Sequence, residues 1–301
     1  MDGTVFDTIV RALNTIYSGA SADRAEFARA QEVCEAFKSD PNAYQYGILL
    51  AHKNSGHNDF QRHYGLALVE HTVRFRWGWG SSQTGVALSE GAQNELRDKL
   101  LALLREGLRD DGTEARFIEE KLAAVISSLI IRMWPSEQWP TLHADLLQLY
   151  NSASPLKQQL VLTIFRQLCE EVFHADRDPV AALRSFDITT GLYSIIYPTS
   201  DLREKFPNGI RVGNKKRKAI KVWVEEGNEE GWFGRWVGTT RQLVASLSAN
   251  PVERGSGDYQ QALKVLGDCI DTITACVTFV PVTVVQRLGV LSLLAELFPV
   301  V

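Results

Sequence analysis

The chain has 301 residues, of which 45% are hydrophobic and 23% charged, and its formal net charge is -4 at pH 7. These values are ordinary for a folded soluble protein and exclude a disordered chain. They also exclude the basic excess that would make nucleic acid the default partner. The four cysteines form no C-x-x-C pair, which favours buried thiols and a reducing compartment.

The N-terminal stretch "MDGTVFDTIVRAL" has neither a basic start nor the apolar run of a signal peptide. No stretch reaches the length of a membrane span without a charge or a helix breaker. We therefore expect a cytosolic or nuclear protein that does not enter a membrane.

Apolar residues recur three and four positions apart along almost the whole chain, which predicts helices. The helix predicted at 58–77 is apolar on two sides, so it should pack against two neighbours and leave one polar strip, which is His63, Ala67, Glu70 and Arg74. The other helices expected in the first half are an N-terminal one with a stripe from Phe6 to Ile16, and those at 22–37, 40–52, 90–109 and 115–134.

The stretch "IRMWPSEQWPTL" at 131–142 contains two Trp-Pro pairs five residues apart. Trp134 should close the incoming helix, because a proline disfavours the α conformation in the residue before it. Pro140 can open the next helix, where no N–H donor is needed. The stretch predicts a tight corner between two antiparallel helices, with Trp134 and Trp139 buried.

In the second half, segment 197–231 is rich in proline, glycine and charge and predicts an inserted loop, with a helical turn around Lys216–Val224. No segment alternates convincingly like a strand, although the β-branched run at 277–285 is ambiguous. The apolar segment 286–301 lacks the polar cap of a solenoid end, which favours an N-terminal piece of a longer array. Helices are expected near 140–151, 156–173, 179–197, 232–247 and 258–280.

The predicted helices group in pairs with a period of roughly 40 residues, the range of HEAT repeats. A pair cannot bury its apolar face alone, so the pairs must stack. The expected fold class is therefore an all-α HEAT-repeat solenoid of antiparallel helix pairs.

Catalytic and metal-binding patterns are weak. The histidines at 52, 57, 63 and 71 lack the one-face pair of a zinc hydrolase, so we expect no metal site and interpret His71 as a satisfied core residue. No serine or cysteine lies in a nucleophile motif, so we expect no enzyme and no cofactor. The basic cluster at 214–221 could contact RNA or an acidic cargo or imitate a nuclear localisation signal, but we favour a solvated loop balanced by nearby glutamates.

Two motifs resemble the exportins of the importin-β superfamily. "RHYGLALVEHTVRFRW" at 62–77 resembles the second B-helix of that superfamily, the B-helix being the second helix of a repeat. The matching residues include Gly65, Glu70, Arg76 and Trp77, whereas Ala67 and Arg74 replace the usual Gln and Lys. "IIRMWPSEQWPTL" at 130–142 resembles the exportin segment W-P-x-x-W-P, with three residues instead of two between Pro135 and Trp139.

The stretches at 30–55 and 155–173 are most similar to the exportin-5 group. The resemblance covers about residues 5–175, whereas from 176 onward it rests on the helical rhythm and a weak "LREKFPNG" match. It implies a region 1–175 of N-terminal HEAT repeats that binds Ran, and a region 176–301 of further repeats that carries the inserted loop and continues into a longer array.

The resemblance implies a nuclear transport receptor without a catalytic centre, folded as a right-handed superhelix. Its expected partners are Ran-GTP on the inner, B-helix surface, a protein cargo, nucleoporins and, in some relatives, a small structured RNA. Such a receptor is a monomer that shuttles between nucleus and cytoplasm. The candidate Ran contacts are Gln31, Glu35, His63, Glu70, Arg74, Arg116 and Glu120. The structural motif residues are Gly65, Arg76, Trp77, Trp134, Pro135, Trp139 and Pro140.

Other functions remain open at this stage. One is a nuclear import receptor, another is a HEAT scaffold without Ran dependence, and a third is a solenoid that binds RNA directly. Binding to Ran loaded with GTP or GDP separates a receptor from a scaffold, and a steep salt dependence would support direct RNA binding.

Overall fold

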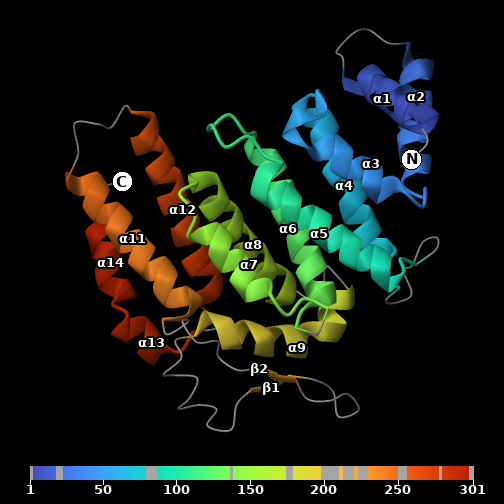
Figure 1. Ribbon diagram of the computed structural model, residues 1–301. Helices are drawn as coiled ribbons and strands as arrows, with labels where there is room; N and C mark the ends of the chain where they lie inside the picture. The colour runs from blue at the N-terminus through green and yellow to red at the C-terminus, as the bar shows by residue number, and fades with distance from the viewer. Residues whose placement is uncertain are drawn as a thin grey trace. The chain divides into compact units, whose positions relative to one another are not determined.

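The computed structural model describes residues 3–17, 23–78, 87–135, 138–173, 179–197, 210–212, 220–222, 230–249, 256–277 and 280–297. The chain divides into two compact units, 1–132 and 133–301, which are described separately. Both are built from helices that pack side by side, as a HEAT-repeat array requires, so the predicted all-α fold class is confirmed (Figure 1). The right-handed superhelix and the division of function near 175 remain predictions.

The helices occur where the apolar spacing predicts them. Unit 1 contains α1 (Gly3–Tyr17), α2 (Arg24–Phe37), α3 (Ala43–Ala51), the short 3₁₀ helix η1 (Lys53–Ser55), α4 (Asp59–Phe75), α5 (Glu90–Glu106) and α6 (Arg116–Met133). Unit 2 contains α7 (Leu142–Tyr150), α8 (Pro155–Phe173), α9 (Pro179–Ile196), α11 (Gly231–Ala249), α12 (Gly257–Val277), α13 (Val282–Arg287) and α14 (Val290–Leu297). The ambiguous run at 277–285 contributes to α13 and is therefore helical from Val282.

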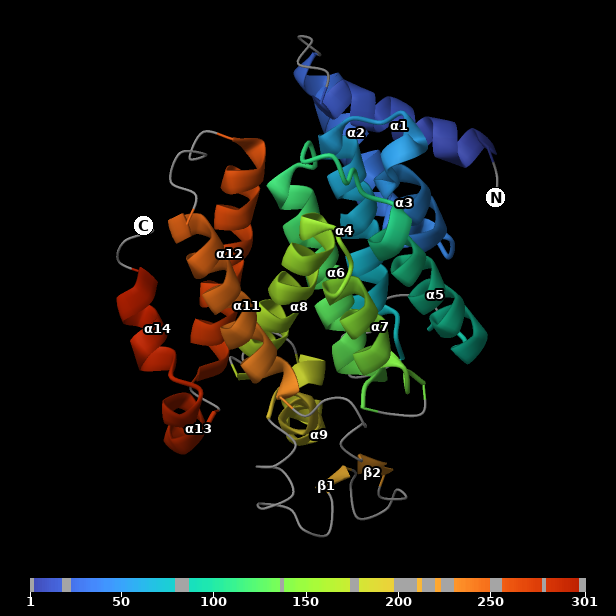
Figure 2. The ribbon, with the colours of Figure 1, turned by 60° about the vertical axis from the view of Figure 1, so that its left-hand side comes forward.

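Two short strands correct the prediction for the inserted segment. β1 (Ile210–Val212) pairs antiparallel with β2 (Ile220–Val222), and β1 contacts α9 (Figure 2). The helical turn expected around Lys216–Val224 is therefore wrong over 220–222, and its other residues lie outside the described part. The physical reason is local: "IRV" and "IKV" each place β-branched residues around a charged one, which suits a strand.

Within each unit, the second helices of successive repeats lie parallel to one another, but the number of residues between them varies. In unit 1, Tyr64 of α4 donates to the carbonyl of Cys34 in α2, 30 residues away, whereas Lys121 of α6 reaches Glu70 of α4, 51 residues away. In unit 2, Gln159 of α8 donates to Asp268 of α12, a separation of 109 residues. The stacking confirms the repeat architecture, but the spacing of roughly 40 residues is not constant along the chain because the intervening segments differ in length.

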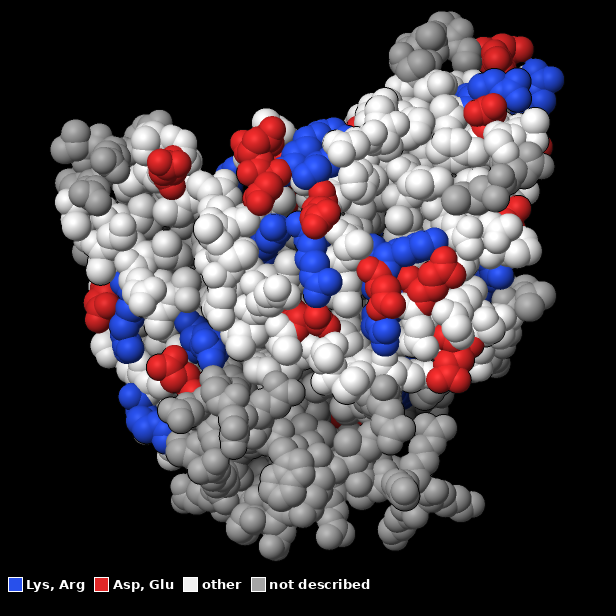
Figure 3. Space-filling model, in the orientation of Figure 1, with Lys and Arg blue, Asp and Glu red and all other residues white. Residues whose placement is uncertain are grey.

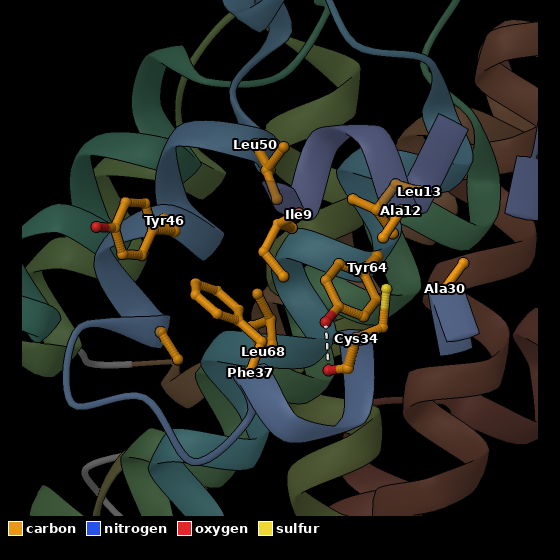
Figure 4. Packing of buried hydrophobic residues seen from close by; sticks show 11 residues of the cluster. Ile9, Ala12, Leu13, Ala30, Cys34, Phe37, Tyr46, Leu50, Tyr64 and Leu68 are labelled. Atoms are coloured by element: carbon orange, nitrogen blue, oxygen red, sulfur yellow. Dashed lines mark hydrogen bonds between the residues drawn. The ribbon is translucent and has the colours of Figure 1, made fainter. Parts of the chain in front are cut away.

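One hydrophobic cluster of unit 1 lies where α1 to α4 converge. Figure 4 shows Ile9 and Leu13 of α1 facing Cys34, Leu50 and Leu68, with the Tyr64 hydroxyl bonded to the Cys34 carbonyl. At the centre of the α3–α4 pair two glycines meet. A Cβ atom on Gly65 would lie 2.6 Å from the carbonyl oxygen of Gly47, and one on Gly47 would lie 2.5 Å from the oxygen of Gly65. Both positions therefore require glycine for the helices to approach this closely.

The Trp-Pro corner lies in unit 2 and is packed as predicted. Trp134 is 7% exposed and Trp139 1%, so the prediction that both indoles are buried is confirmed. The Trp139 Nε1–H donates to the Asp145 carboxylate at 3.1 Å. A Cβ atom at Gly191 of α9 would meet the Trp134 ring at 2.5 Å, which shows how closely the corner rests on α9. The Trp134–Pro135 peptide is cis, and Pro140 is exposed.

The entry and exit of the inserted segment lie next to each other. Gly231, the first residue of α11, has a φ of +64° and packs against the end of α9. A Cβ atom there would lie 2.4 Å from the carbonyl oxygen of Tyr197. Both the backbone conformation and the space therefore require glycine at this junction.

A buried histidine gives unit 2 a predicted pH dependence. His143 of α7 accepts a hydrogen bond from Trp232 Nε1 at 3.0 Å. Burial, assisted by the charge of Arg235, lowers the pKa of His143 from 6.5 to about 4. Since the unfolded chain keeps the higher pKa, it binds more protons between those values. The stability is complete above pH 6.5, and we expect about 3 kcal/mol to be lost as the pH falls to about 4.

Denaturant unfolding at pH 7 and pH 4.5 would measure this loss. His143→Asn supplies a matched control, because the amide oxygen can replace the imidazole Nδ1 as acceptor without titrating. The variant should lose less stability than the parent on acidification, while His63 and His71 contribute equally in both chains. Equal losses in the two chains would contradict the role of His143.

Candidate partner-binding surface

A charge cluster forms on the polar strip of α4, where the sequence predicts a partner surface. Glu70 and Arg74 form an ion pair at 3.1 Å, and Lys121 of α6 pairs with the same Glu70. Arg132 of α6 donates to the backbone carbonyl of Arg74. The side chains of the Glu70–Arg74–Lys121 cluster are 17%, 24% and 22% exposed, so the cluster is half-buried and bridges two B-helices.

His63 connects this cluster to an exposed row of aromatic rings. The pKa of His63 is lowered, first by burial and then by the charge of Lys121, so the ring is neutral at pH 7. Its ring meets the edge of Phe117 in α6 with centroids 5.6 Å apart. The sequence placed His63 on the strip, whereas its aromatic neighbour comes from another repeat.

We call the stacked rings Tyr17, Phe60 and Phe117 the aromatic row. Tyr17 stacks on Phe60 with centroids 5.5 Å apart, and Phe60 stacks on Phe117 at 5.8 Å. Phe60 is 58% exposed, although it precedes the buried Tyr64 and Leu68 at helical spacing on the same side of α4. Large apolar side chains that remain exposed and contiguous across α1, α4 and α6 are typical of interaction surfaces.

The two candidates on α2 lie beyond the charge cluster. Gln31 and Glu35 are exposed, and Glu35 forms an ion pair with Lys38 at 2.7 Å. His71 of α4 lies near these charges, since burial first and then Lys38 lower its pKa. The expectation that His71 is a satisfied core residue is wrong: the ring is half-buried against Phe75, and its Nδ1 has no hydrogen-bond partner among the described residues.

The remaining candidates, Arg116 and Glu120, lie on the first turns of α6 beside Phe117. They form an i,i+4 ion pair at 3.3 Å and are 42% and 47% exposed. An ion pair this exposed contributes little to stability, so both side chains can change partner at low cost. On the face drawn in Figure 3, basic and acidic side chains are interspersed over the described residues.

The motif residues near 65–77 position the strip rather than contact a partner. Arg76 is 3% exposed and donates to the carbonyl oxygens of Asp40 and Pro41 at 2.7 and 3.3 Å, which fixes the corner between α2 and α3. Trp77 is buried, and its carbonyl accepts from Gln93 of α5 at 3.2 Å. These residues therefore hold three helices around α4.

One buried ion pair escapes sequence reasoning. Arg62, at the start of α4, donates from both terminal nitrogens to Glu114, with distances of 2.6 and 2.8 Å, and the two side chains are 0% and 1% exposed. Asp59 also contacts Arg62 at 3.2 Å, and Arg62 Nε donates to the carbonyl of Ala51. Glu114 lies in the segment before α6, so only the folded chain brings the pair together.

Within the described ranges, no three His, Cys, Asp or Glu side chains gather as a metal site would require. In the same residues, no helix is long and apolar enough to cross a membrane.

Comparison with known proteins shows that this chain is similar to exportins. A family described as "Xpo1: Exportin 1-like protein" matches residues 115–196, from α6 through α9. "Protein MSN5" of Saccharomyces cerevisiae is 28% identical over 306 residues, covering 97% of this chain. "Exportin-5" of Mus musculus is 27% identical over 167 residues, and "Exportin-T" of Aspergillus terreus is 28% identical over 151 residues, covering 55% and 49% of this chain.

The matched part is a small share of each relative. The chain spans 22% of the length of MSN5, 13% of mouse Exportin-5 and 14% of the Aspergillus Exportin-T. The similarity to MSN5 includes the whole surface described above, since it extends over nearly all of this chain.

Proposed function

This chain belongs to the exportin family of the importin-β superfamily, and on that premise we propose that it acts in a nuclear export receptor and binds Ran in its GTP form. The binding surface is the B-helix side of unit 1. It comprises the exposed ends of α2 and α6 and the charge cluster Glu70–Arg74–Lys121. The chain contributes binding free energy and no catalysis.

The observation that carries this proposal is the charge cluster. Its three side chains bridge α4 and α6 while keeping 17–24% of their surface exposed, so a partner can contact two repeats at once. One apolar side of α4 packs against α3 and is therefore not available to a partner. Charged groups placed this way steer a partner and select it by complementarity of charge.

The further partners follow from the same premise. We propose that the full receptor carries a protein cargo, with a small structured RNA as an additional class, and passes the pore through contacts with nucleoporins. It acts as a monomer and shuttles between nucleus and cytoplasm.

The test reverses the charges of the cluster without separating its ion pairs. In the triple variant Glu70→Arg, Arg74→Glu, Lys121→Glu, each contact again joins opposite charges. We expect binding to Ran-GTP to weaken by about tenfold or more, equivalent to about 1.4 kcal/mol, with an unchanged melting temperature. The measurement is titration of this chain with Ran loaded with GTP or GDP.

The matched control is a second i,i+4 pair in the same unit. Glu95 and Lys99 of α5 pair at 2.6 Å, and exchanging them as Glu95→Lys, Lys99→Glu should leave Ran binding unchanged. If the triple variant binds Ran-GTP as tightly as this control does, the cluster is not the contact. Equal affinity of the unmutated chain for the GTP and GDP forms would favour the Ran-independent scaffold instead.

A further inference from the structure

We propose that Cys169 and Cys276 are a redox-sensitive modification site that forms a disulfide between α8 and α12. The two Sγ atoms are 3.2 Å apart. A disulfide bond requires about 2.0 Å, so the sulfurs must approach by roughly another ångström. This site lies in unit 2 and is independent of the proposed Ran contact.

The surrounding contacts hold the two thiols opposite each other. Along the same interface, Gln159 donates to Asp268 at 2.8 Å and Thr272 donates to the carbonyl of Leu162 at 3.1 Å. Arg166 pairs with Asp271 at 3.2 Å. These contacts fix the register of the two helices, and Cys169 and Cys276 continue it near the C-terminal end of each helix. Figure 1 shows the ribbons of α8 and α12 in unit 2.

Both cysteines are buried, and this burial determines how readily their thiols react with an oxidant. Cys169 is 1% exposed and Cys276 0%. The hydrogen bond with Cys169 and then burial raise the pKa of the Cys276 thiol, so little thiolate is present at pH 7. The pair should therefore resist mild oxidation and respond slowly to a small oxidant that can enter when the helices separate transiently.

With a hydroperoxide as oxidant the reaction balances. One cysteine, as thiolate, attacks a peroxide oxygen and breaks the O–O bond, which gives a sulfenic acid and, after protonation, water. The sulfur of the second cysteine then attacks the sulfenic sulfur, loses its proton and expels a second water. Two thiols and one hydrogen peroxide thus become one disulfide and two waters. The second step is fast, because the partner sulfur is already in contact.

The disulfide would prevent α8 and α12 from separating. Without it, α8 and α12 are held by hydrogen bonds, the Arg166–Asp271 ion pair and packing, which can open and close. With it, residues 107 positions apart in the chain are covalently joined. We expect the oxidised chain to melt several degrees higher, because the crosslink restricts the unfolded state.

The test uses the reduced, folded chain treated with hydrogen peroxide, then alkylated and digested with trypsin without reduction. Peptide 167–177 contains Cys169, whereas peptide 265–287 contains both Cys269 and Cys276. We expect these peptides to be disulfide-linked in the parent chain and in Cys269→Ala, and unlinked in Cys276→Ala. Cys269 is equally buried and lies on the same helix, which makes its variant the matched control.

A dithiol reductant should reverse both the link and the rise in melting temperature. Three outcomes would overturn the proposal. One is a link that disappears in Cys269→Ala. Another is a link found between chains rather than within one. The third is peroxide treatment that oxidises Cys34 or Cys269 in the folded parent chain while Cys169 and Cys276 remain unlinked. Because the parent chain alone gives this last result, the test holds even if an alanine variant folds poorly.

Discussion

Replacing Trp139 with alanine is expected to lower the free energy of unfolding by about 3–5 kcal/mol. The indole is 1% exposed, so its removal leaves a cavity between the Trp-Pro corner and the helices around it. The Asp145 carboxylate also loses the Nε1–H donor at 3.1 Å, while the Thr141 hydroxyl still donates to it. Urea denaturation followed by circular dichroism measures the change without relying on tryptophan fluorescence.

Two neighbouring substitutions serve as controls for this prediction. Trp139→Phe keeps most of the apolar volume and loses the hydrogen bond, so it should cost less than alanine does. Pro140→Ala changes an exposed position in the same corner and should have little effect. An unchanged denaturation midpoint for Trp139→Ala would show that the corner does not contribute to stability.

Replacing Arg62 with alanine should be comparably destabilising, by about 3–5 kcal/mol, because it leaves Glu114 buried without its counter-charge. The Glu114 side chain is 1% exposed, and among the described residues it then keeps hydrogen bonds from the backbone N–H groups of Arg109 and Ala115. The corner between α4 and the start of α6 would then hold an uncompensated carboxylate. Denaturant unfolding of the single variants and of the double variant measures the coupling between the two side chains.

The double variant Arg62→Met, Glu114→Leu distinguishes a buried charge from lost packing. Replacing both partners with apolar side chains removes the uncompensated charge, so it should restore much of the stability lost in Arg62→Ala. The exposed pair Glu95–Lys99 provides the comparison, and Lys99→Ala should cost less than about 1 kcal/mol. If Arg62→Ala lowered the free energy of unfolding as little as Lys99→Ala does, the buried pair would contribute no more than a surface contact.

The sequence predicts the helices well because their signal is local. The spacing of Phe6 to Ile16, or the proline that follows Trp134, acts within one or two turns. The apolar sides of α4 likewise reveal which strip remains for a partner, and Glu70 and Arg74 do lie on that strip and pair with each other.

The pairings between helices could not be predicted from the sequence. Lys121 and Glu114 find their partners 51 and 52 residues away, and neither position differs locally from an ordinary surface charge. Phe60 follows a core-like spacing, yet it lies in the first turn of its helix, where it stacks on exposed rings instead of entering the core. The short strands were missed because three residues give too little alternation to stand out within a charged segment.

The contact between Gly231 and Tyr197 has a consequence for how this protein can vary. Since the chain leaves α9 and re-enters α11 at touching positions, the junction sets no length for the residues between them. A longer, shorter or exchanged segment is therefore compatible with the same positions of α9 and α11. The same junction offers a point at which a fluorescent domain or an affinity tag can be grafted into the middle of the chain.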